Sequence, residues 1–562
     1  ARTAPLGTRI ANATAIKLLQ GYLEHPNGAR AEVLTDELCY TDPMAVDHDL
    51  LVSIVDATAR LIVRATSGQY FDQDDNNGEY HLRTQGGVNF EQQISEYAES
   101  LEPARKDEAF FRFLTEYLEI ADTPYRAGFR IYEHQIEWRS RHITRNGYIF
   151  MGGANEKSTT QPRQSFYMVF MPIFQEDKKT RNNDGEDIYF VMDDMPDEFK
   201  ELVCRFGAAY LLMTSADSSQ RMHYRTAYES LLKKAGRVFA DNFLDCTKVY
   251  YATAEPRTLK TYHLPGAGAS HMDYFNHVAS ETFEEQFCDE APYYPAFTHA
   301  PTVITSANRD RYIMGAKAKL IKPSEPNQYG EAVLAALQCI DRGEISTASS
   351  IYAQSILDRL DEKGAGKVLN RNEILSMLPN SDGRIWRSSD YGVESDFEFL
   401  VLCALVVTGE IEIMMGNNTE VNASNIESIR SLDKDHYWSF EAIKRPKGLN
   451  MPLIKALTTA FCGADLSGRL DDASTYANLV ASGRKIADGT ATFVGRNLMH
   501  GAILVAGVEL FSAGDVLNLK NNLTALKNFA DRLVTYSSAA RLKNLPWDMA
   551  VVGQMKSYLD ER

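Results

Sequence analysis

The chain has 562 residues, 44% of them hydrophobic and 24% charged, and its 76 acidic side chains outnumber its 59 basic ones to give a formal net charge of -17. A chain of this length is too long for one hydrophobic core, and at roughly 150 residues per domain it divides into about three to four domains. The acidic balance argues against a general DNA-coating protein, because DNA phosphates repel such a chain wherever a local basic face is absent.

The composition also indicates where the protein works. The longest apolar run, "FLVLCALVV" from Phe399, falls short of the roughly 18 residues that a membrane span needs. The seven cysteines lie far apart without a C-x-x-C pair, which favours reduced thiols in a cytoplasmic protein over a disulfide framework or a zinc site. The opening residues, "ARTAPLGTRI", hold neither an initiator Met nor a signal peptide, so either the natural start has been removed or the sequence is a piece of a longer protein.

Residues 1–64 are predicted to form a helical segment, because apolar residues recur at helical spacing in "TRIANATAIKLLQGYLEH" and "DHDLLVSIVDATARLIVRA". The next stretch, "GQYFDQDDNNGEYHLRT", places two aromatic-rich runs around Asn76, Asn77 and Gly78. Asn and Gly tolerate the positive φ of tight turns, so this pattern predicts a hairpin. A calcium loop is a poor alternative, since Gln73 and Thr84 would stand where an EF-hand with Gly78 at its sixth position needs Asp and Glu.

Residues 65–262 are predicted to form a mixed α/β domain with antiparallel strands. "FRIYEHQIEWRSRHITRNGYIFMGG" alternates in polarity over two runs, and "SFYMVFMPIFQ" and "DIYFVMD" flank the turn-rich "NNDGED". Helices return at "DEFKELVCRFGAAYLLMTSAD" and "YRTAYESLLKKAGRVFADNFLD". Residues 263–330 hold several prolines and glycines and are expected to form an irregular connector.

Residues 331–446 show the element order of a winged helix, with helical segments followed by a hairpin at "GEIEIMMGNNTEVN". Asn370 and Glu373 are spaced as a capping box at one helix start. The helix before the hairpin, "VESDFEFLVLCALVV", is acidic and then apolar, and the hairpin has no Lys or Arg. This pattern favours protein packing over DNA reading, which uses a basic or polar helix face.

Residues 447–562 are predicted to form a helical domain. In "VLNLKNNLTALKNFADRLVTY" an apolar stripe runs along one helix face; its members are Leu519, Leu523, Leu526, Ala530 and Leu533. The domain's own core or a partner helix must cover such a stripe, and its own core is the simpler interpretation. The whole chain is therefore expected to be an α+β, multidomain protein.

"GGANEKSTTQPRQSFYMVF", from Gly152, shares letters with a P-loop. Aligning Lys157 and Ser158 with the last two P-loop positions puts Met151 and Glu156 where glycines must stand, and Glu156 would bring negative charge to a phosphate. "DEKGAGKVLN" fails as well, because Asp361 replaces the first glycine and Val368 removes the hydroxyl that binds magnesium. No ATP site is predicted in this chain.

The same loop is still a candidate contact surface for a partner or for nucleic acid, because exposed loops carry function more often than cores do. Its hydrogen-bonding and basic residues are Asn155, Lys157, Ser158, Gln161 and Arg163. A purely structural turn is the alternative.

A second candidate contact lies in "WRSRHITR". Arg139, Arg141, His142 and Arg145 are mixed with aromatic residues there, an arrangement that suits a phosphate backbone. A solvated strand face is the alternative interpretation.

The sequence contains little evidence of a metal site. Glu176, Asp177 and Lys178 resemble half of a metal-dependent nuclease site, which Asp193 or Asp194 would complete, but the adjoining "TRNNDGED" suits a solvated turn. His263, His271, His277 and His299 lack H-E-x-x-H or paired-cysteine spacing, and no G-x-S-x-G elbow occurs. No catalytic, cofactor or metal residue is predicted.

Four blocks carry a family resemblance. "RNGYIFMGGANEKSTTQPRQSFYMVFMP", "GKVLNRNEIL", "FLVLCALVVTGEIEI" and "FEAIKRPKGLNMPLIKAL", in this order, resemble the PglY and BrxC-like large ATPases of bacterial phage-exclusion (BREX/Pgl) systems. The chain is similar to the region that follows the family's AAA-type P-loop ATPase domain, to which ATP and Mg are assigned. The resemblance implies an alkaline-phosphatase-like protein and an adenine-specific DNA methyltransferase as partners, but no catalytic residue carries over.

Two functions are therefore expected. The first is a non-catalytic scaffold and coupling region of a phage-defence ATPase, mediating partner assembly. The alternative is a DNA-binding effector or metal-dependent nuclease acting on phage DNA.

Overall fold

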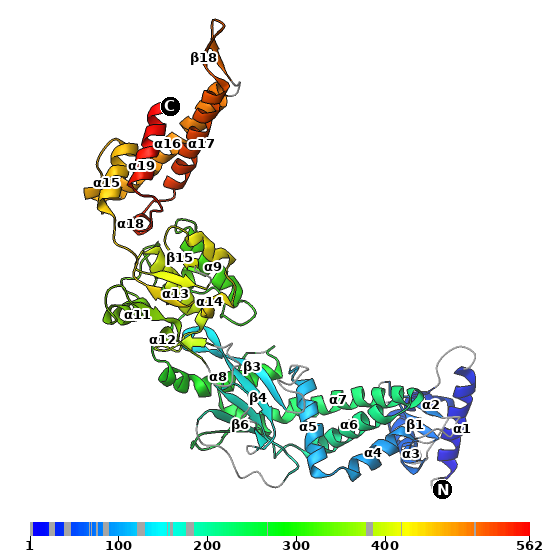
Figure 1. Ribbon diagram of the computed structural model, residues 1–562. Coiled ribbons are helices and arrows are strands. Elements are labelled where there is room, and N and C mark those ends of the chain that lie inside the picture. The colour runs from blue at the N-terminus through cyan, green and yellow to red at the C-terminus, as the bar shows by residue number, and fades with distance from the viewer. Residues whose placement is uncertain are drawn as a thin grey trace. The chain divides into compact units, whose positions relative to one another are not determined.

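Helices and short strands alternate along the chain, so the α+β, multidomain class predicted from the sequence is confirmed (Figure 1). The computed structural model describes residues 4–21, 28–38, 47–66, 68, 70–74, 77–82, 89–120, 130–153, 156–157, 161–175, 185–266, 268–377, 386–416, 419–498 and 502–562. Unit 1 comprises Ala1–Glu133, Ile149–Lys157 and Tyr167–Val278; unit 2 comprises His134–Tyr148, Ser158–Phe166 and Ala279–Arg562. The five-part division predicted from the sequence stays a prediction.

Unit 1 begins with three helices and a hairpin that share a small core. These elements are α1 (Ala4–Gly21), α2 (Ala31–Leu38), α3 (His48–Thr66), β1 (Phe71–Gln73) and β2 (Tyr80–Leu82). Gln73 pairs with Tyr80, and Gly78 has φ 73° in the turn between the two strands. The predicted hairpin is confirmed, although Asn76 lies outside the described residues. Tyr80 fills the core beneath it and donates a 2.7 Å hydrogen bond to Asp56 Oδ1.

Four longer helices build the aromatic core of unit 1. They are α4 (Phe90–Ser100), α5 (Pro103–Tyr117), α6 (Asp197–Ser215) and α7 (Ser218–Cys246). Phe113 of α5 contacts Phe199 of α6 and Phe239 of α7 edge-on, with ring centroids 5.3 and 5.7 Å apart. Helices α5 and α6 approach most closely at Gly207, where a Cβ atom would lie 2.3 Å from the Ala109 Cβ. Only glycine fits this crossing without moving a helix.

A six-stranded sheet has the order β3-β4-β5-β6-β7-β8. Its strands are β3 (Ile131–Trp138), β4 (Ile143–Met151), β5 (Tyr167–Phe170), β6 (Asp187–Val191), β7 (Lys248–Tyr251) and β8 (Arg257–Thr258). The predicted antiparallel arrangement is wrong for β5 and β6, which pair in parallel, although β7 is antiparallel to both of its neighbours. Every residue of β5 and β6 is buried, as in parallel strands generally, and the connection between them exceeds a hairpin turn.

The predicted irregular connector at residues 263–330 is wrong over most of its length. It contains α8 (His271–Glu290) and α9 (Arg309–Ile321), and η3 (Leu259–Thr261) precedes it. The prolines that suggested a connector flank these helices, and Gly315 lies inside α9 without interrupting it. Phe275, Phe283 and Phe287 recur at helical spacing and are buried, which explains why α8 forms.

The middle of unit 2 is built around α13 (Ser395–Val407), in which every residue from Phe397 to Val406 is buried. Its neighbouring helices are α10 (Gln328–Ala336), α11 (Ile351–Glu362), α12 (Arg371–Ile374), η4 (Ile426–Ser431) and α14 (His436–Ser439). Its strands are β9 (Ile340–Asp341), β10 (Glu344–Ile345), β11 (Val368–Asn370), β12 (Leu375–Met377), β13 (Trp386–Ser388), β14 (Glu412–Met415), β15 (Thr419–Val421) and β16 (Ala442–Lys444). A helix buried on every side belongs to a core and cannot enter a DNA groove.

The winged-helix interpretation is not confirmed. The predicted hairpin is present as β14 and β15, and the capping box joins Asn370 and Glu373 at α12 as predicted. However, the four-stranded sheet has the order β11-β16-β14-β15. The additional strand β16 therefore lies between β11 and the hairpin.

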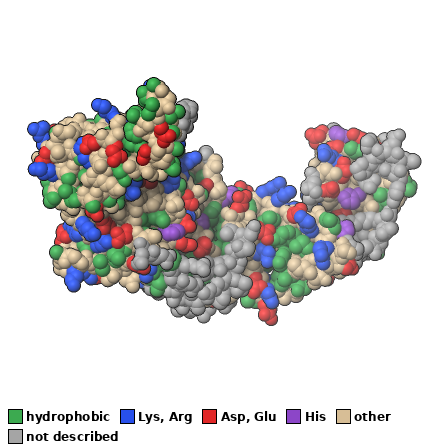
Figure 2. Space-filling model, turned by 45° about the horizontal axis from the view of Figure 1, so that its top comes forward, with side chains coloured by type: hydrophobic (Ala, Val, Ile, Leu, Met, Phe, Trp, Pro, Cys, Tyr) green, Lys and Arg blue, Asp and Glu red, His purple; other side chains and the backbone are tan. Residues whose placement is uncertain are grey.

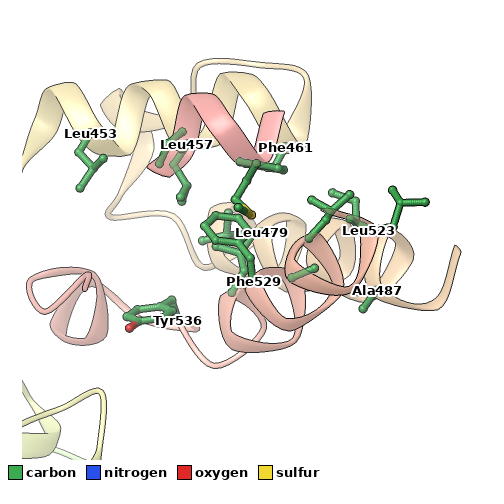
Figure 3. Packing of buried hydrophobic residues seen from close by; sticks show 14 of the residues in the cluster. Leu453, Leu457, Phe461, Leu479, Ala487, Leu523, Phe529 and Tyr536 are labelled. Atoms are coloured by element: carbon green, nitrogen blue, oxygen red, sulfur yellow. The ribbon is translucent and has the colours of Figure 1, made fainter. Parts of the chain in front are cut away.

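The C-terminal part of unit 2 is helical, as predicted. Its elements are α15 (Met451–Cys462), η5 (Ser467–Arg469), α16 (Ala473–Asn497), β17 (Ile503–Val505), β18 (Val508–Phe511), α17 (Ala513–Leu533), α18 (Ala539–Leu542) and α19 (Met549–Glu561). Figure 3 shows Phe461 and Leu479 facing Leu523 and Phe529 in one core. The stripe on α17 lies in this core, so the prediction that the domain covers it is confirmed. Among the described residues, no helix combines the length and apolar character needed to cross a bilayer.

Candidate functional site

Lys157, the lysine of the loop with P-loop letters, is paired inside unit 1. Its Nζ lies 2.7 Å from both carboxylate oxygens of Asp187, the buried first residue of β6. The Tyr189 hydroxyl donates to the same carboxylate at 3.0 Å, and Lys157 Nζ lies 4.2 Å from the centroid of the Tyr167 ring. The positive charge that a phosphate would need is already neutralised by Asp187.

Glu156 closes the same loop through a second ion pair. Arg130 Nη2 donates to Glu156 Oε2 at 2.9 Å, and the backbone N–H of Gly153 donates to that oxygen at 3.2 Å. Arg130 is fixed in turn by a 2.7 Å bond from its Nε to the Met151 carbonyl. A carboxylate stands where a P-loop needs backbone N–H groups and glycine, so these residues do not fit ATP phosphates.

The other predicted contact residues of this loop lie in different environments. Gln161 is buried and Arg163 is exposed. Asn155 and Ser158 lie outside the described residues. The prediction of a contact surface therefore stays a prediction, with Arg163 as its exposed member.

The three predicted basic contact residues of "WRSRHITR" also differ in their burial. Arg139 and Arg141 belong to η1 (Arg139–Arg141) between β3 and β4 and are half-buried. Arg145 is only 4% exposed. Residues alternate between the faces of a strand, and on β4 the buried positions Ile143, Arg145 and Gly147 alternate with more exposed ones. Arg145 is therefore a core cation and not a surface contact.

An aromatic cage surrounds the Arg145 guanidinium. Its carbon lies 5.0 Å from the Trp138 ring centroid, 5.2 Å from that of Tyr294 and 5.7 Å from that of Phe287. Such faces attract a desolvated cation through their negative quadrupole. The cage accounts for the aromatic residues that accompany the arginines in this stretch.

Glu394 stands at the centre of an ion-pair network in which Arg145 is buried and Arg309, Glu394 and Asp396 are each less than 20% exposed. The Tyr294 hydroxyl donates to Glu394 Oε2 at 2.5 Å. Arg309 Nη2 lies 3.5 Å from the same oxygen, and Arg145 Nη1 lies 3.7 Å from Oε1. Arg309 also makes a two-pronged contact with Asp396, from Nε to Oδ2 at 2.5 Å and from Nη2 to Oδ1 at 2.7 Å. The network thus joins β4, the first residue of α9 and the first turn of α13.

The network sets the protonation of its members. Burial by itself would raise the pKa of Glu394, but the guanidinium groups of Arg309, Arg387 and Arg145 outweigh it and lower that pKa to about 2. Burial, together with the Glu394 charge, raises the pKa of Tyr294 well above its ordinary value. Glu394 is therefore an acceptor and Tyr294 a neutral donor throughout the physiological range.

Glu398, one turn further along α13, behaves in the opposite way. Burial, followed by the charge of Asp390, raises its pKa to about 8. Its Oε2 has no hydrogen-bond partner within the described ranges. Glu398 is therefore a buried acid that is mostly protonated at neutral pH.

A cleft of about 370 Å³ lies beside the network in unit 2, lined in part by Arg141, Tyr293, Tyr294, His299 and Tyr352. Its lining contains no Asp or Glu, although acids outnumber bases in the chain by 76 to 59. Tyr293 is 65% exposed, and Arg141 Nη2 donates to the Pro292 carbonyl at 2.7 Å. A cation, a histidine and an exposed aromatic ring without a competing acid can hold an anionic group attached to a planar one.

A second cleft, of about 480 Å³, is less suited to an anion. Arg371 lines it together with Glu373 and Glu441. The Arg371 guanidinium lies 4.7 Å from the centroid of the Trp386 ring, which stacks on Trp438. Two carboxylates beside one arginine disfavour a negatively charged ligand.

The predicted half-site of a nuclease is not assembled by the described residues. Asp194 pairs with Lys248 at 2.7 Å, and the Asp193 carbonyl accepts from Lys200 at 2.9 Å. Glu176, Asp177 and Lys178 lie outside the described residues. Across the described ranges, no group of three or more His, Cys, Asp or Glu could hold a metal ion.

Two of the four histidines considered from the sequence lie in surroundings that bear on a site. His271 packs on Phe243, with ring centroids 4.9 Å apart, and burial lowers its pKa. His299 lines the cleft of Arg141. The cleft was not predicted as a site, because its members come from four separate segments of unit 2.

Three family models match the chain. Residues 1–88 match the DUF6079 second domain, residues 92–291 match the DUF6079 third domain, and residues 309–445 match the fourth domain of this family of unknown function. Together the three matches cover most of the chain. No curated protein and no solved structure matches it.

Proposed function

Since the chain carries the second, third and fourth domains of the DUF6079 family, we propose that it is a non-catalytic scaffold and coupling region of a larger cytoplasmic phage-defence ATPase. The phage-defence context rests on the four sequence blocks that resemble PglY and BrxC-like proteins. In this proposal ATP hydrolysis belongs to a P-loop domain outside the sequence described here. The chain itself positions partners.

The observation that carries the proposal is the ion-pair network centred on Glu394. Its arginine and carboxylate side chains bind one another, and these ion pairs hold β4, α9 and α13 in one arrangement. Buried ion pairs add little net stability compared with apolar packing, but an arrangement in which each carboxylate contacts a guanidinium group disfavours alternatives that leave a carboxylate alone. A region that transmits position between partners needs such a fixed arrangement.

The proposed partners are the alkaline-phosphatase-like protein and the adenine-specific DNA methyltransferase that the family resemblance implies. The test is affinity purification of the chain from cells that also express each of these proteins, together with a measurement of ATP turnover by the purified chain. We expect at least one partner to co-purify and the chain to show no turnover. Measurable turnover by the chain, or recovery of neither partner, contradicts the proposal.

A matched pair of variants links the experiment to the network. Glu394→Gln removes the charge that three arginines surround, and we expect it to reduce the recovery of the partner. Glu362→Gln changes the same group at an exposed position near the end of α11 and is expected to leave recovery unchanged. Equal recovery with both variants would show that the network has no part in coupling.

Nucleic-acid binding is the second candidate, favoured by the acid-free cleft of Arg141 and Tyr293. A phosphate on the guanidinium and a base on the exposed Tyr293 ring is the pattern of single-strand recognition. On the face drawn in Figure 2, Lys and Arg are scattered among Asp and Glu, so a contact there would be short and local.

Fluorescence anisotropy with a labelled single-stranded oligonucleotide tests this candidate at low and moderate salt. We expect Arg141→Ala and Tyr293→Ala each to weaken binding about tenfold. Arg484→Ala, at an exposed arginine of α16, is the control and should bind as the unaltered chain does. An oligonucleotide that fails to bind at low salt rejects the candidate.

A further inference from the structure

Four arginine side chains gather near Tyr294 in unit 2. This arginine cluster consists of Arg141, Arg145, Arg309 and Arg387. Within the cluster, Arg309 is paired with Glu394 and Asp396, and the Arg145 Nη1 lies 3.7 Å from Glu394. Two carboxylates therefore stand within ion-pair distance of the cluster.

The other two arginines of the cluster have no counter-charge. Among the described carboxylates, none makes an ion pair with Arg141 or Arg387. Glu284 comes near η1, where it accepts from the Ser140 N–H at 3.3 Å, but it does not pair with Arg141. Four guanidinium groups are thus matched by two carboxylates, and two positive charges are left over.

The cluster also holds hydrogen-bond donors that nothing in the described chain satisfies. The Nε atoms of Arg141, Arg145 and Arg387 are buried and have no hydrogen-bond partner, and the same is true of the Arg145 Nη1. Buried donors without a partner are rare in native proteins, where ordered water or a bound ion usually receives them. The cluster therefore retains both charge and donors for a ligand.

Arg141 connects the cluster to the cleft of about 370 Å³, which it lines together with Tyr294 and without any Asp or Glu. The Arg141 guanidinium carbon lies 5.5 Å from the centroid of the Trp138 ring, and that of Arg145 lies 5.0 Å from the same centroid. Arg145 is only 4% exposed, so its charge acts through the protein interior, where salt screens it little. The cleft consequently lies beside charge that the fold does not neutralise.

We propose that the cleft of Arg141 binds a terminal phosphate group, the 5′-phosphate of a nucleotide or of a single strand. A phosphomonoester carries about 1.5 to 2 negative charges near neutral pH, whereas each phosphodiester inside a strand carries one. The two surplus positive charges match the monoester better than the diester. This inference rests on the second candidate function, whose cleft it shares, and adds that the end of the strand is recognised and not its interior.

The rest of the lining favours a nucleotide over a phosphotyrosine peptide. Tyr293, Thr298 and His299 line the cleft and are exposed. A tyrosine ring stacks on a base, and a hydroxyl and an imidazole can bond the polar edges of a base or sugar. The ring of a phosphotyrosine has no such edge. The volume of the cleft lies within the range of about 300 to 1,000 Å³ that is usual for small-ligand sites.

Fluorescence anisotropy of the whole chain at low salt tests the proposal with two single-stranded oligonucleotides of one sequence. Both carry the label at the 3′ end, and they differ only in a 5′-phosphate or a 5′-hydroxyl. We expect the phosphorylated strand to bind at least about tenfold more tightly, because charge-assisted hydrogen bonds to a guanidinium are strong. Adenosine 5′-monophosphate should compete for the site better than inorganic phosphate, and adenosine should not compete.

Three variants, each checked for its fold by circular dichroism, connect the preference to the cluster. Arg141→Gln should abolish the difference between the two strands, because it removes the guanidinium that lines the cleft. Arg387→Gln should reduce the difference, since it removes one of the two surplus charges. Arg484→Gln, at an exposed arginine of α16, is the matched control and should leave the difference unchanged.

Equal affinity for the two strands overturns this inference and leaves the second candidate function standing. Failure of both strands to bind rejects the second candidate as well. A preference for the 5′-phosphate that persists in Arg141→Gln overturns the inference too, because the contact would then lie elsewhere. Competition by phosphotyrosine or by inorganic phosphate that equals competition by adenosine 5′-monophosphate overturns the assignment to a nucleotide.

Discussion

Both carboxylate oxygens of Asp187 lie 2.7 Å from the Lys157 Nζ, although the two residues are 30 positions apart in the chain. This contact joins the loop after β4 to the start of β6, and it explains why a loop with P-loop letters carries a lysine. The lysine balances a buried acid. This pairing makes the lysine part of the fold of unit 1.

Replacing Lys157 by Met should destabilise the protein by about 3 kcal/mol, because Asp187 would remain buried without its counter-charge. The double variant Lys157→Met/Asp187→Asn should lose less than the sum of the two single variants, since no charge is left alone. Denaturant unfolding followed by circular dichroism measures both values. Additive losses would show that the two side chains do not interact.

Glu394→Gln should destabilise the protein by about 3 kcal/mol near neutral pH, because the buried Arg145 and the half-buried Arg309 and Arg387 lose their shared carboxylate. The pKa of Glu394 is lowered from 4.5 to about 2, so the stability that its charge contributes is complete above pH 4.5 and disappears as the pH falls through about 2. The gap in Tm between the unaltered chain and the variant should therefore narrow below pH 4.5. Thermal unfolding at several acidic pH values measures this difference in Tm. A difference that widens as the pH falls below 4.5 would contradict the lowered pKa of Glu394.

Glu398→Gln should have the opposite pH profile. The pKa of Glu398 is raised from 4.5 to about 8, so its contribution to stability is present below pH 4.5 and is lost as the pH rises through about 8. The variant should match the unaltered chain in acid and exceed it at about pH 9 by a few kcal/mol. Denaturant unfolding at the two pH values tests this. A variant that is less stable than the unaltered chain at high pH would show that the Glu398 carboxylate is stabilised in the fold.

Gly207→Ala should destabilise the protein by about 1 to 3 kcal/mol, because the new methyl group would lie 2.3 Å from the Ala109 Cβ and force α5 and α6 apart. Gly553→Ala is the matched control on α19, where a Cβ atom would meet nothing within 4 Å. That control should stabilise its helix by up to about 1 kcal/mol, since alanine has the higher helix propensity. Equal effects of the two changes in a denaturant titration would contradict the close crossing.

Local patterns predicted local structure well. The Asn-Gly turn between β1 and β2, the Asn370–Glu373 capping box and the stripe on α17 each depend on residues a few positions apart. Their geometry follows from backbone and side-chain preferences within one turn or one hairpin. Distant partners are not needed to recognise them.

What could not be predicted depends on distant partners. The sequence does not distinguish the three arginines of "WRSRHITR". Arg145 alone of the three is buried, because its guanidinium contacts Glu394 and an aromatic cage that come from distant segments. The parallel pairing of β5 and β6 is likewise decided by the sheet as a whole. Helix α8 was missed for another reason, because flanking prolines and glycines outweighed its regular phenylalanines. The cleft of Arg141 also depends on distant partners, since its lining residues come from four separate segments of the chain.

The uninterrupted burial of α13 has a consequence for biosynthesis. The helix ends at Val407, whereas the sheet beside it is completed only when β16 ends at Lys444. At about 5 to 20 residues per second, the ribosome needs about two to seven seconds after Val407 to supply the later elements that pack on this apolar segment, which are β14, η4 and α14. A nascent chain that stalls in this interval would leave part of the surface of ten consecutive core residues uncovered, so chains truncated there are expected to aggregate more readily than the full chain.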